Sequence, residues 1–214
     1  STRDIRVDHI VLLDNDQQKL KTYGEISREL SRRLDPDLTF EVTSDARAAL
    51  TGVDYIITTI RAGGDAGRLF DEQTCLAHGV LGQETTGAGG FAMAIRSVPT
   101  LVYYCTLARE VANPGHLIFN FTNPSGIITQ ALRSKGFDNV YGICDAPSGF
   151  IKQLEEILEI PYGTLDIECY GLNHLSWFRN AKVNGRDVQR ELLDNPRTYE
   201  HSEMRLFTRE MARI

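Results

Sequence analysis

Residues 7–14, VDHIVLLD, form a short and mostly apolar run that ends in an acidic residue. A polar, amphipathic segment follows from about Asp16 to Leu34, so the chain begins its pattern with a strand and then a helix. The pattern predicts further strands at residues 38–43, 53–60, 116–121 and 139–143. Segments with helical patterns lie between them, at residues 45–50, 89–111 and 124–135. Alternation of this kind is typical of an α/β fold with a doubly wound parallel sheet.

The acid at the end of the first run, Asp14, indicates which strand this is. In a dinucleotide-binding fold the first strand leads into a Gly-rich turn that the pyrophosphate can approach, whereas Asp14-Asn15-Asp16 contains no glycine. An acid at this place matches the second strand, whose carboxylate accepts a hydrogen bond from the adenosine ribose. We therefore expect the sequence to begin after strand one and its loop, and we expect Asp14 to contact NAD. The absence of an arginine directly after Asp14 favours NAD over NADP.

The length and composition allow one good core, with 214 residues of which 42% are hydrophobic. We expect a Rossmann-like NAD-binding domain over residues 1–160, of the kind found in lactate and malate dehydrogenases. The start of a second, α+β substrate domain is expected over residues 161–214. There the extended run 175–183 and the turn pair Asn184-Gly185 predict a hairpin, and residues 203–214 predict an amphipathic helix.

Charge and hydropathy exclude some classes of protein. The net charge of −6 argues against a nucleic-acid-binding surface, although it leaves room for a local cationic pocket that holds a phosphate. No apolar run approaches the ~18 residues that span a bilayer, and the first residues lack the apolar region of a signal peptide. We expect a cytoplasmic protein that binds neither nucleic acid nor membrane.

Two short stretches, GICDAP at 142–147 and GLNH at 171–174, each place a metal-ligand type at the end of a predicted strand. A helix predicted at 148–160 separates them, so the two strand ends could face each other across a β-α-β unit. A thiolate from Cys144 and an imidazole from His174 would suit a divalent metal ion. The alternative is a buried cysteine and a histidine that bonds to backbone carbonyls. The four cysteines follow neither zinc-finger nor disulfide-framework spacing.

Five further motifs precede these stretches. They are RAGG at 61–64, Arg68, DEQ at 71–73, GQET at 82–85 and NFTNP at 120–124. In this order, and over nearly all of the chain, the motifs resemble glycoside hydrolase family 4, the NAD- and metal-dependent 6-phosphoglycosidases. The resemblance implies hydrolysis of a 6-phosphoglucoside, such as a phosphorylated disaccharide, with NAD and Mn²⁺ or another divalent ion. It also implies a homodimer or homotetramer.

The implied mechanism is a redox route to hydrolysis. Hydride removal at C3 of the sugar acidifies C2, a base takes the C2 proton, and elimination of the aglycone is followed by addition of water and return of the hydride. The metal, held by Cys144 and His174, would act as a Lewis acid at the sugar oxygens. The family's base is a tyrosine whose position would fall beyond Ile214. We therefore expect the 214-residue chain alone to be inactive.

Catalytic roles are expected for Glu84, whose Gly-flanked turn could bring it to the site, and for Asp145. Glu84 could equally fix its Gly-flanked loop. Asp145 corresponds to an aspartate that helps to protonate the departing oxygen in the α-glucosidase branch. Ala146 departs from the methionine usual there, which leaves the anomer open. Asp145 could instead cap the following helix.

The remaining assignments concern binding. Arg68 matches the family's ligand for the sugar phosphate, and a guanidinium fork suits that anion. Arg96 is a second candidate for the same anion, or for an internal ion pair. Asn123 is expected near a substrate hydroxyl, although Asn123-Pro124 is also a common start of a helix. The full sets are Asp14, Arg61 and Asn120 for the cofactor, and Arg68, Arg96, Asn123 and Asn173 for the substrate.

Three rival functions remain open. A relative acting on non-phosphorylated glycosides or uronides could use Arg68 for a carboxylate. An NAD-dependent 2-hydroxyacid dehydrogenase would share the strand and helix alternation but need no metal. A non-enzymatic binding module is the third.

Overall fold

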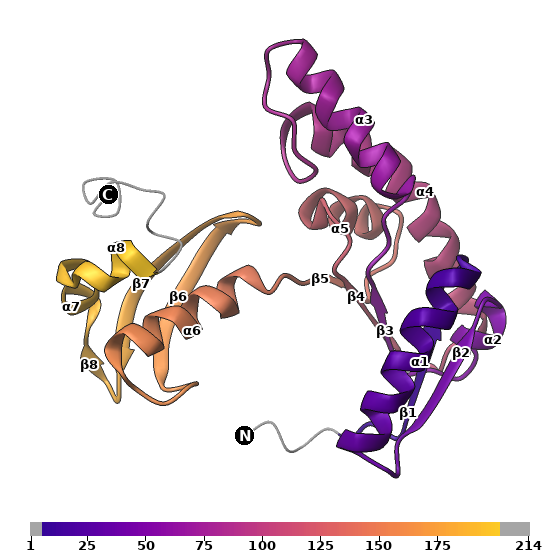
Figure 1. Ribbon diagram of the computed structural model, residues 1–214, viewed down its shortest axis with the longest axis horizontal. Helices are drawn as coiled ribbons and strands as arrows, with labels where there is room; N and C mark the ends of the chain where they lie inside the picture. Colours follow the sequence, from indigo (N-terminus) through magenta and orange to yellow (C-terminus); the bar gives the residue numbers. More distant parts are fainter. Residues whose placement is uncertain (1–5, 202–214) are drawn as a thin grey trace. The chain divides into compact units, whose positions relative to one another are not determined.

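The computed structural model describes residues 6–201 and divides into two compact units, Ser1–Tyr141 and Gly142–Ile214 (Figure 1). The sequence pattern placed the boundary near residue 160. The helix between the two positions, α6 (Ala146–Leu158), packs its apolar face with the second unit, and the division therefore precedes it.

The first unit alternates strands and helices, as the sequence predicts. Strands β1 and β2 are parallel, and so are β3 and β4, with β5 on the far side of β4. The α/β class is thus confirmed. Within residues 6–201, however, β1 and β3 are not paired, so the strands form two sheets that match the two flanks of the predicted doubly wound sheet. The elements are β1 (His9–Leu13), α1 (Gln17–Leu34), β2 (Thr39–Thr43), α2 (Ala46–Leu50), β3 (Tyr55–Thr58), α3 (Gly64–Ala77), α4 (Gly87–Val111), β4 (Leu117–Asn120), α5 (Ser125–Ser134) and β5 (Val140–Gly142).

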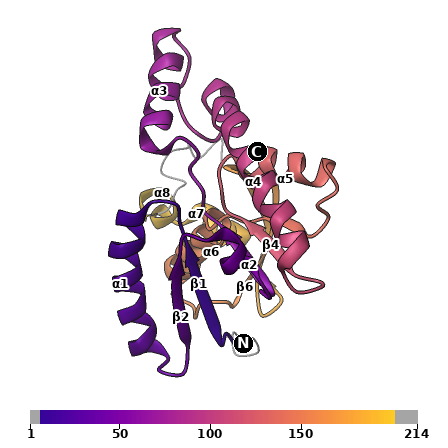
Figure 2. The ribbon, with the colours of Figure 1, turned by 90° about the vertical axis from the view of Figure 1, so that its right-hand side faces the viewer.

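Helix α1 begins where the sequence predicts. The side chain of Asp16 accepts hydrogen bonds from the backbone N–H groups of Gln18 and Lys19, which satisfies two donors that have no partner inside the helix. Arg32 and Arg33 lie in the last turn, where positively charged side chains interact favourably with the helix dipole. Figures 1 and 2 show α1 lying along the β1–β2 pair.

Helix α4 supplies the centre of the first core. Its fully buried Leu101 packs in a cluster with side chains from β4 and α5, among them Ile118, Ile128 and Leu132. Among residues 6–201, α4 is also the one helix long and apolar enough to cross a membrane, with a mean hydropathy of 1.2 over 18 residues. The expectation that no segment comes near this measure was wrong. Part of this apolar surface packs in the first core, since 39% of the 18-residue window is buried.

The second unit has its own core. Helix α6 lies against an antiparallel sheet in the order β6-β7-β8, and the hairpin predicted at Asn184-Gly185 is confirmed, with both residues at positive φ. The predicted β-α-β unit is wrong, because β6 pairs antiparallel with β7 and belongs to a different sheet from β5. The helix predicted at 203–214 lies outside the described residues. The elements after α6 are β6 (Leu165–Leu172), β7 (Leu175–Val183), β8 (Arg186–Asp187), α7 (Gln189–Asp194) and α8 (Pro196–His201).

The position of Leu101 gives a test of the first core. Leu101→Ala should lower the free energy of unfolding by about 2–5 kcal/mol, because it removes buried methyl groups and leaves a cavity. Leu101→Met, which keeps the volume, should cost less than about 1.5 kcal/mol. Urea unfolding of both variants measures the difference, and equal losses would contradict the packing described.

Candidate functional site

Two arginines in the first unit converge on one carboxylate. Arg61 follows β3 and donates from Nη1 to Glu84, while Nε of Arg68 on α3 lies 4.0 Å from the same Glu84 oxygen. Arg68 also donates to Glu72 Oε1 at 2.8 Å, and this bond is the main reason that the pKa of Arg68 is raised. Arg61, Arg68, Glu72 and Glu84 are called the arginine–glutamate cluster. The Arg68 side chain is 43% exposed and Glu84 is 18% exposed, so solvent reaches the arginine more freely than the carboxylate.

The loop that carries Glu84 lies tightly against α3. A side chain at Gly82 would clash with the backbone of Glu72, and the side-chain oxygen of Gln83 accepts from the backbone N–H of Thr85 at 2.8 Å. Glycine is required at 82 by this close approach. In this structure Glu84 therefore ties its own loop to Arg61, which is the structural alternative raised for it.

Arg96 takes part in an internal ion pair, the second of the two roles expected for it. Its guanidinium donates to both carboxylate oxygens of Asp71 and, through Nε, to the carbonyl oxygen of Ala62 at 3.2 Å. The pKa of Arg96 is raised, chiefly by the bond to Asp71. The sequence did not identify Asp71 as the partner, because the two residues are far apart in the chain. The i,i+4 spacing of Arg68 and Glu72 did offer a signal for their pairing.

Asn120 ends β4, as expected, and its side chain is bonded within the protein. Its side chain is 0% exposed, accepts from the hydroxyl of Thr58 on β3 at 3.0 Å and donates to the carbonyl of Thr122 at 3.3 Å. Its Nδ2 also lies 3.3 Å from Thr129 Oγ1 on α5. These bonds position the loop between β4 and α5, and the cofactor contact expected of Asn120 stays a prediction. Asn123, in that loop, is half-buried and precedes a cis bond to Pro124.

Asp14 lies at the end of β1, as predicted, and accepts from the backbone N–H of Asp16 at 2.9 Å. It is near Tyr104 of α4, whose pKa is raised mainly by burial and further by the charges of Tyr103 and Asp14. The carboxylate is half-buried. It is therefore held at the strand end with part of its surface open.

In the second unit, Cys144 and His174 come together although thirty residues separate them in the chain. Cys144 Sγ lies 3.5 Å from His174 Nε2. His174 belongs to the two-residue connection between β6 and β7, where it has a φ of 63°, and Cys144 precedes α6. The hairpin turn and the start of the helix thus bring the two predicted ligands together.

The Cys144–His174 pair fits a shared metal ion in distance and in chemistry. Metal–sulfur and metal–nitrogen bonds of about 2.3 and about 2.1 Å place two ligands of one ion close to the observed separation. The side-chain nitrogen of the neighbouring Asn173 is buried and has no hydrogen-bond partner, so a donor is left over beside this pair. Over residues 6–201 no group of three or more His, Cys, Asp and Glu side chains could hold an ion. Further ligands would have to come from elsewhere, such as a substrate.

Asp145 does not cap α6 with its side chain. It is the N-cap residue by position, but its conformation is helical and its carboxylate makes no capping bond. Its Oδ1 lies 3.9 Å from Cys144 Sγ, and the residue is exposed. The capping alternative raised from the sequence is therefore not what this side chain does here.

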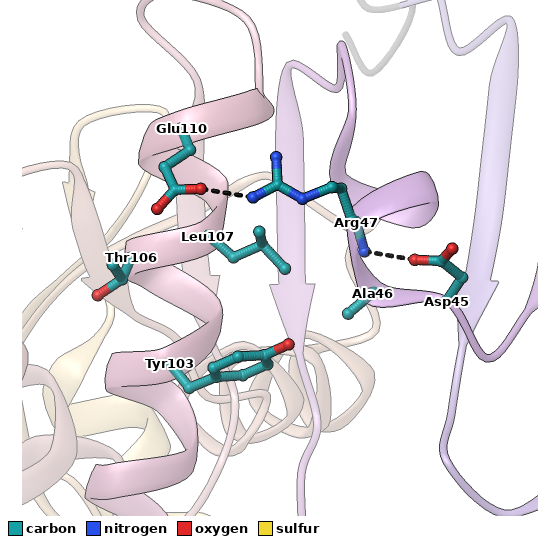
Figure 3. A pocket seen from close by; sticks show the side chains of 7 residues that line it. All are labelled: Asp45, Ala46, Arg47, Tyr103, Thr106, Leu107 and Glu110. Carbon is teal, nitrogen blue, oxygen red and sulfur yellow. Dashed lines mark hydrogen bonds and ion pairs between the residues drawn. The ribbon is translucent and has the colours of Figure 1, made fainter.

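A separate pocket of about 560 Å³ lies between α2 and α4 and contains none of the predicted site residues (Figure 3). Arg47 and Glu110 at its edge pair with each other at 2.6 Å, and Asp45 accepts from the backbone of Arg47. These charged groups are exposed and bonded among themselves. Among the described residues, no buried polar side chain lines this pocket.

Comparisons with known proteins agree on one family. Residues 1–160 match the family described as Family 4 glycosyl hydrolase. The chain is 35% identical over 196 residues to the 6-phospho-beta-glucosidase BglT of Thermotoga maritima, covering 91% of this chain and 46% of that protein. It is also 35% identical over 196 residues to the phospho-alpha-glucosidase PagL of Clostridium acetobutylicum, covering 87% and 44%.

A solved structure supports the same fold. The Thermotoga maritima 6-phospho-beta glucosidase with manganese, NAD⁺ and glucose-6-phosphate superposes with a TM-score of 0.83 at 33% identity, over 90% of this chain and 46% of that one. The Rossmann-like prediction is thereby confirmed. The chain spans less than half the length of the relatives it matches.

The buried amide of Asn120 gives a test of the loop. Asn120→Ala should lower the free energy of unfolding by about 1–3 kcal/mol, because Thr58 and the carbonyl of Thr122 lose buried partners. Gln130→Ala, on the exposed face of α5, is the control and should stay within about 0.5 kcal/mol of the parent. Denaturant unfolding measures both, and an Asn120→Ala effect no larger than the control would refute the positioning role.

Proposed function

Since this chain belongs to family 4 of the glycosyl hydrolases, we propose that its protein hydrolyses the O-glycosidic bond of a 6-phosphoglucoside with NAD and a divalent metal ion. The observation that carries the proposal is the 3.5 Å approach of Cys144 Sγ to His174 Nε2. A simple hydroxyacid dehydrogenase has no need of such a pair. The relatives of both anomeric classes match equally well, so the anomer is left to experiment.

The arginine–glutamate cluster supports a phosphorylated substrate. Arg68 presents a partly exposed fork that suits the bidentate recognition of a phosphate. Binding would require Arg68 to share its donors with Glu72, since the two are bonded at 2.8 Å. A uronide is the second candidate, because a carboxylate fits the same fork, but the names of the relatives specify phosphorylated glucosides.

When bound, NAD⁺ would supply a hydride acceptor and the metal ion a Lewis acid. Cys144 and His174 would hold the ion, and Asp14 would accept from the ribose of the nucleotide. Asp145, exposed and free of a capping bond, would give a proton to the departing glycosidic oxygen. The unsatisfied amide nitrogen of Asn173 would donate to a substrate hydroxyl. We propose that the protein acts as a cytoplasmic homo-oligomer, and that Asn123 and Glu84 also serve the substrate site.

Activity measurements test the proposal directly. The full-length protein should hydrolyse a chromogenic α- or β-glucoside 6-phosphate, and it should need both NAD⁺ and Mn²⁺. Chelation should abolish turnover, and restoring Mn²⁺ should recover it. The unphosphorylated glucosides serve as controls. Hydrolysis that proceeds without NAD⁺ would rule out the redox route.

Thiol labelling tests the metal ligands without relying on turnover. At pH 8 Mn²⁺ should slow the labelling of Cys144 by about tenfold or more, because a bound thiolate is not free to react. Cys169, which is exposed, should react at the same rate with and without the ion. Cys105 should remain unlabelled, since burial raises its pKa to about 11 and keeps it protonated at this pH. His174→Ala should remove the protection, and protection that survives this change would exclude His174 as a ligand.

A further inference from the structure

One guanidinium joins three elements of the first unit. Arg96 on α4 donates from Nε to the carbonyl of Ala62, in the turn after β3, at 3.2 Å. Its two terminal nitrogens donate to the two carboxylate oxygens of Asp71 on α3, the Nη1 bond at 2.9 Å. The Asp71 side chain is 7% exposed and the Arg96 side chain 30%, so the carboxylate is largely withdrawn from water and the guanidinium only partly. Helices α3 and α4 lie side by side in both ribbon views (Figures 1 and 2).

The glycines of the turn make room for this side chain. Gly63 has a φ of 85°, and a Cβ placed there would lie 3.0 Å from Arg96 Nε. A Cβ at Gly67 would lie 3.5 Å from the guanidinium carbon. The guanidinium therefore rests against the backbone of the turn and of the first part of α3. Displacing it would leave Asp71 as a buried carboxylate without its cation, which is costly.

The turn and α3 also carry the two more exposed arginines, Arg61 and Arg68. Arg61 immediately precedes Ala62, whose carbonyl Arg96 holds, and Arg68 lies on α3 between Gly67 and Asp71. Both reach Glu84 from these places. The Arg96 fork therefore holds the backbone from which both of these side chains extend.

We propose that Arg96 and Asp71 form a positioning pair for the anion site, by which we mean the proposed phosphate site at Arg68. The pair fixes the Ala62–Gly63 turn and α3, so that Arg61 and Arg68 both reach Glu84. The pair does not itself bind the substrate. This inference rests on the proposed function for the identity of the anion. It differs from the simpler expectation that Arg96 is a second phosphate ligand, because its fork is already occupied by Asp71.

The variant Asp71→Asn, made in the full-length protein, distinguishes a positioning role of Arg96 from direct binding of the phosphate by Arg96. If Arg96 is a positioning residue, Asp71→Asn and Arg96→Lys should both raise KM for the 6-phosphoglucoside by about tenfold, with kcat changed by less than about threefold. If Arg96 binds the phosphate, Asp71→Asn frees its fork, and KM should fall or stay the same. An unchanged or lowered KM in Asp71→Asn would overturn the proposal. Arg96→Lys keeps the charge without the fork and raises KM in both cases, so if Asp71→Asn does not fold, hydrogen exchange of Arg96→Lys at the turn decides between them.

Hydrogen exchange provides a readout that does not depend on hydrolysis. Backbone amides of residues 61–67 should exchange about tenfold faster in both variants, because the turn has lost its anchor. Arg47→Met is the matched control, since it breaks an exposed ion pair between α2 and α4 and should change neither KM nor exchange at the turn. Exchange as slow as in the parent would refute the positioning pair even if the protein hydrolyses nothing. An inactive parent with fast-exchanging variants would instead refute the proposed function alone.

Discussion

Helix α4 has to satisfy two demands at once, and the first unit depends on its doing so. Its C-terminal half buries Leu101 and Cys105 in the core with β4 and α5. Its N-terminal half begins directly after the loop of Glu84 and carries Arg96. Arg96 and Leu101 lie on either side of Pro99, little more than one helical turn apart. The packing of one half therefore constrains the position of the other, even though Pro99 removes one hydrogen bond of the helix. The core thereby constrains where Arg96 and its partner Asp71 lie.

The charges near that site are arranged in pairs. Asp71 is matched by Arg96, Glu84 by Arg61, and each acid lies on a different element from its partner. A largely buried carboxylate such as Asp71 is tolerated only with a well-placed cation. Removing Arg96 would leave this charge unpaired and lower the stability of the fold. The partners on the solvent side contribute less to stability, because water screens them. They are correspondingly easier to redirect toward a ligand.

Local signals in the sequence predicted local structure well. The start of α1 near Asp16, the hairpin at Asn184-Gly185 and the alternation of strands and helices all follow from rules that act over a few residues. The approach of Cys144 and His174 was also predicted, although the β-α-β unit expected to bring them together was wrong. The pattern showed that β6 is a strand but not that its partner is β7, since periodicity carries no information about pairing.

What the sequence did not supply has one physical cause, which is that side-chain partners distant in the chain leave no mark on the pattern. Nothing in the sequence shows that the amide of Asn120 is buried and bonded within the protein rather than open to a ligand. The same holds for Arg96 and Asp71. The division of the chain between Tyr141 and Gly142 has a further consequence. Both candidate metal ligands fall in one unit, while the residues assigned to nucleotide and phosphate fall in the other. The 3.5 Å approach of Cys144 to His174 is therefore set within the second unit, by the β6–β7 turn and the start of α6, and owes nothing to the core around Leu101.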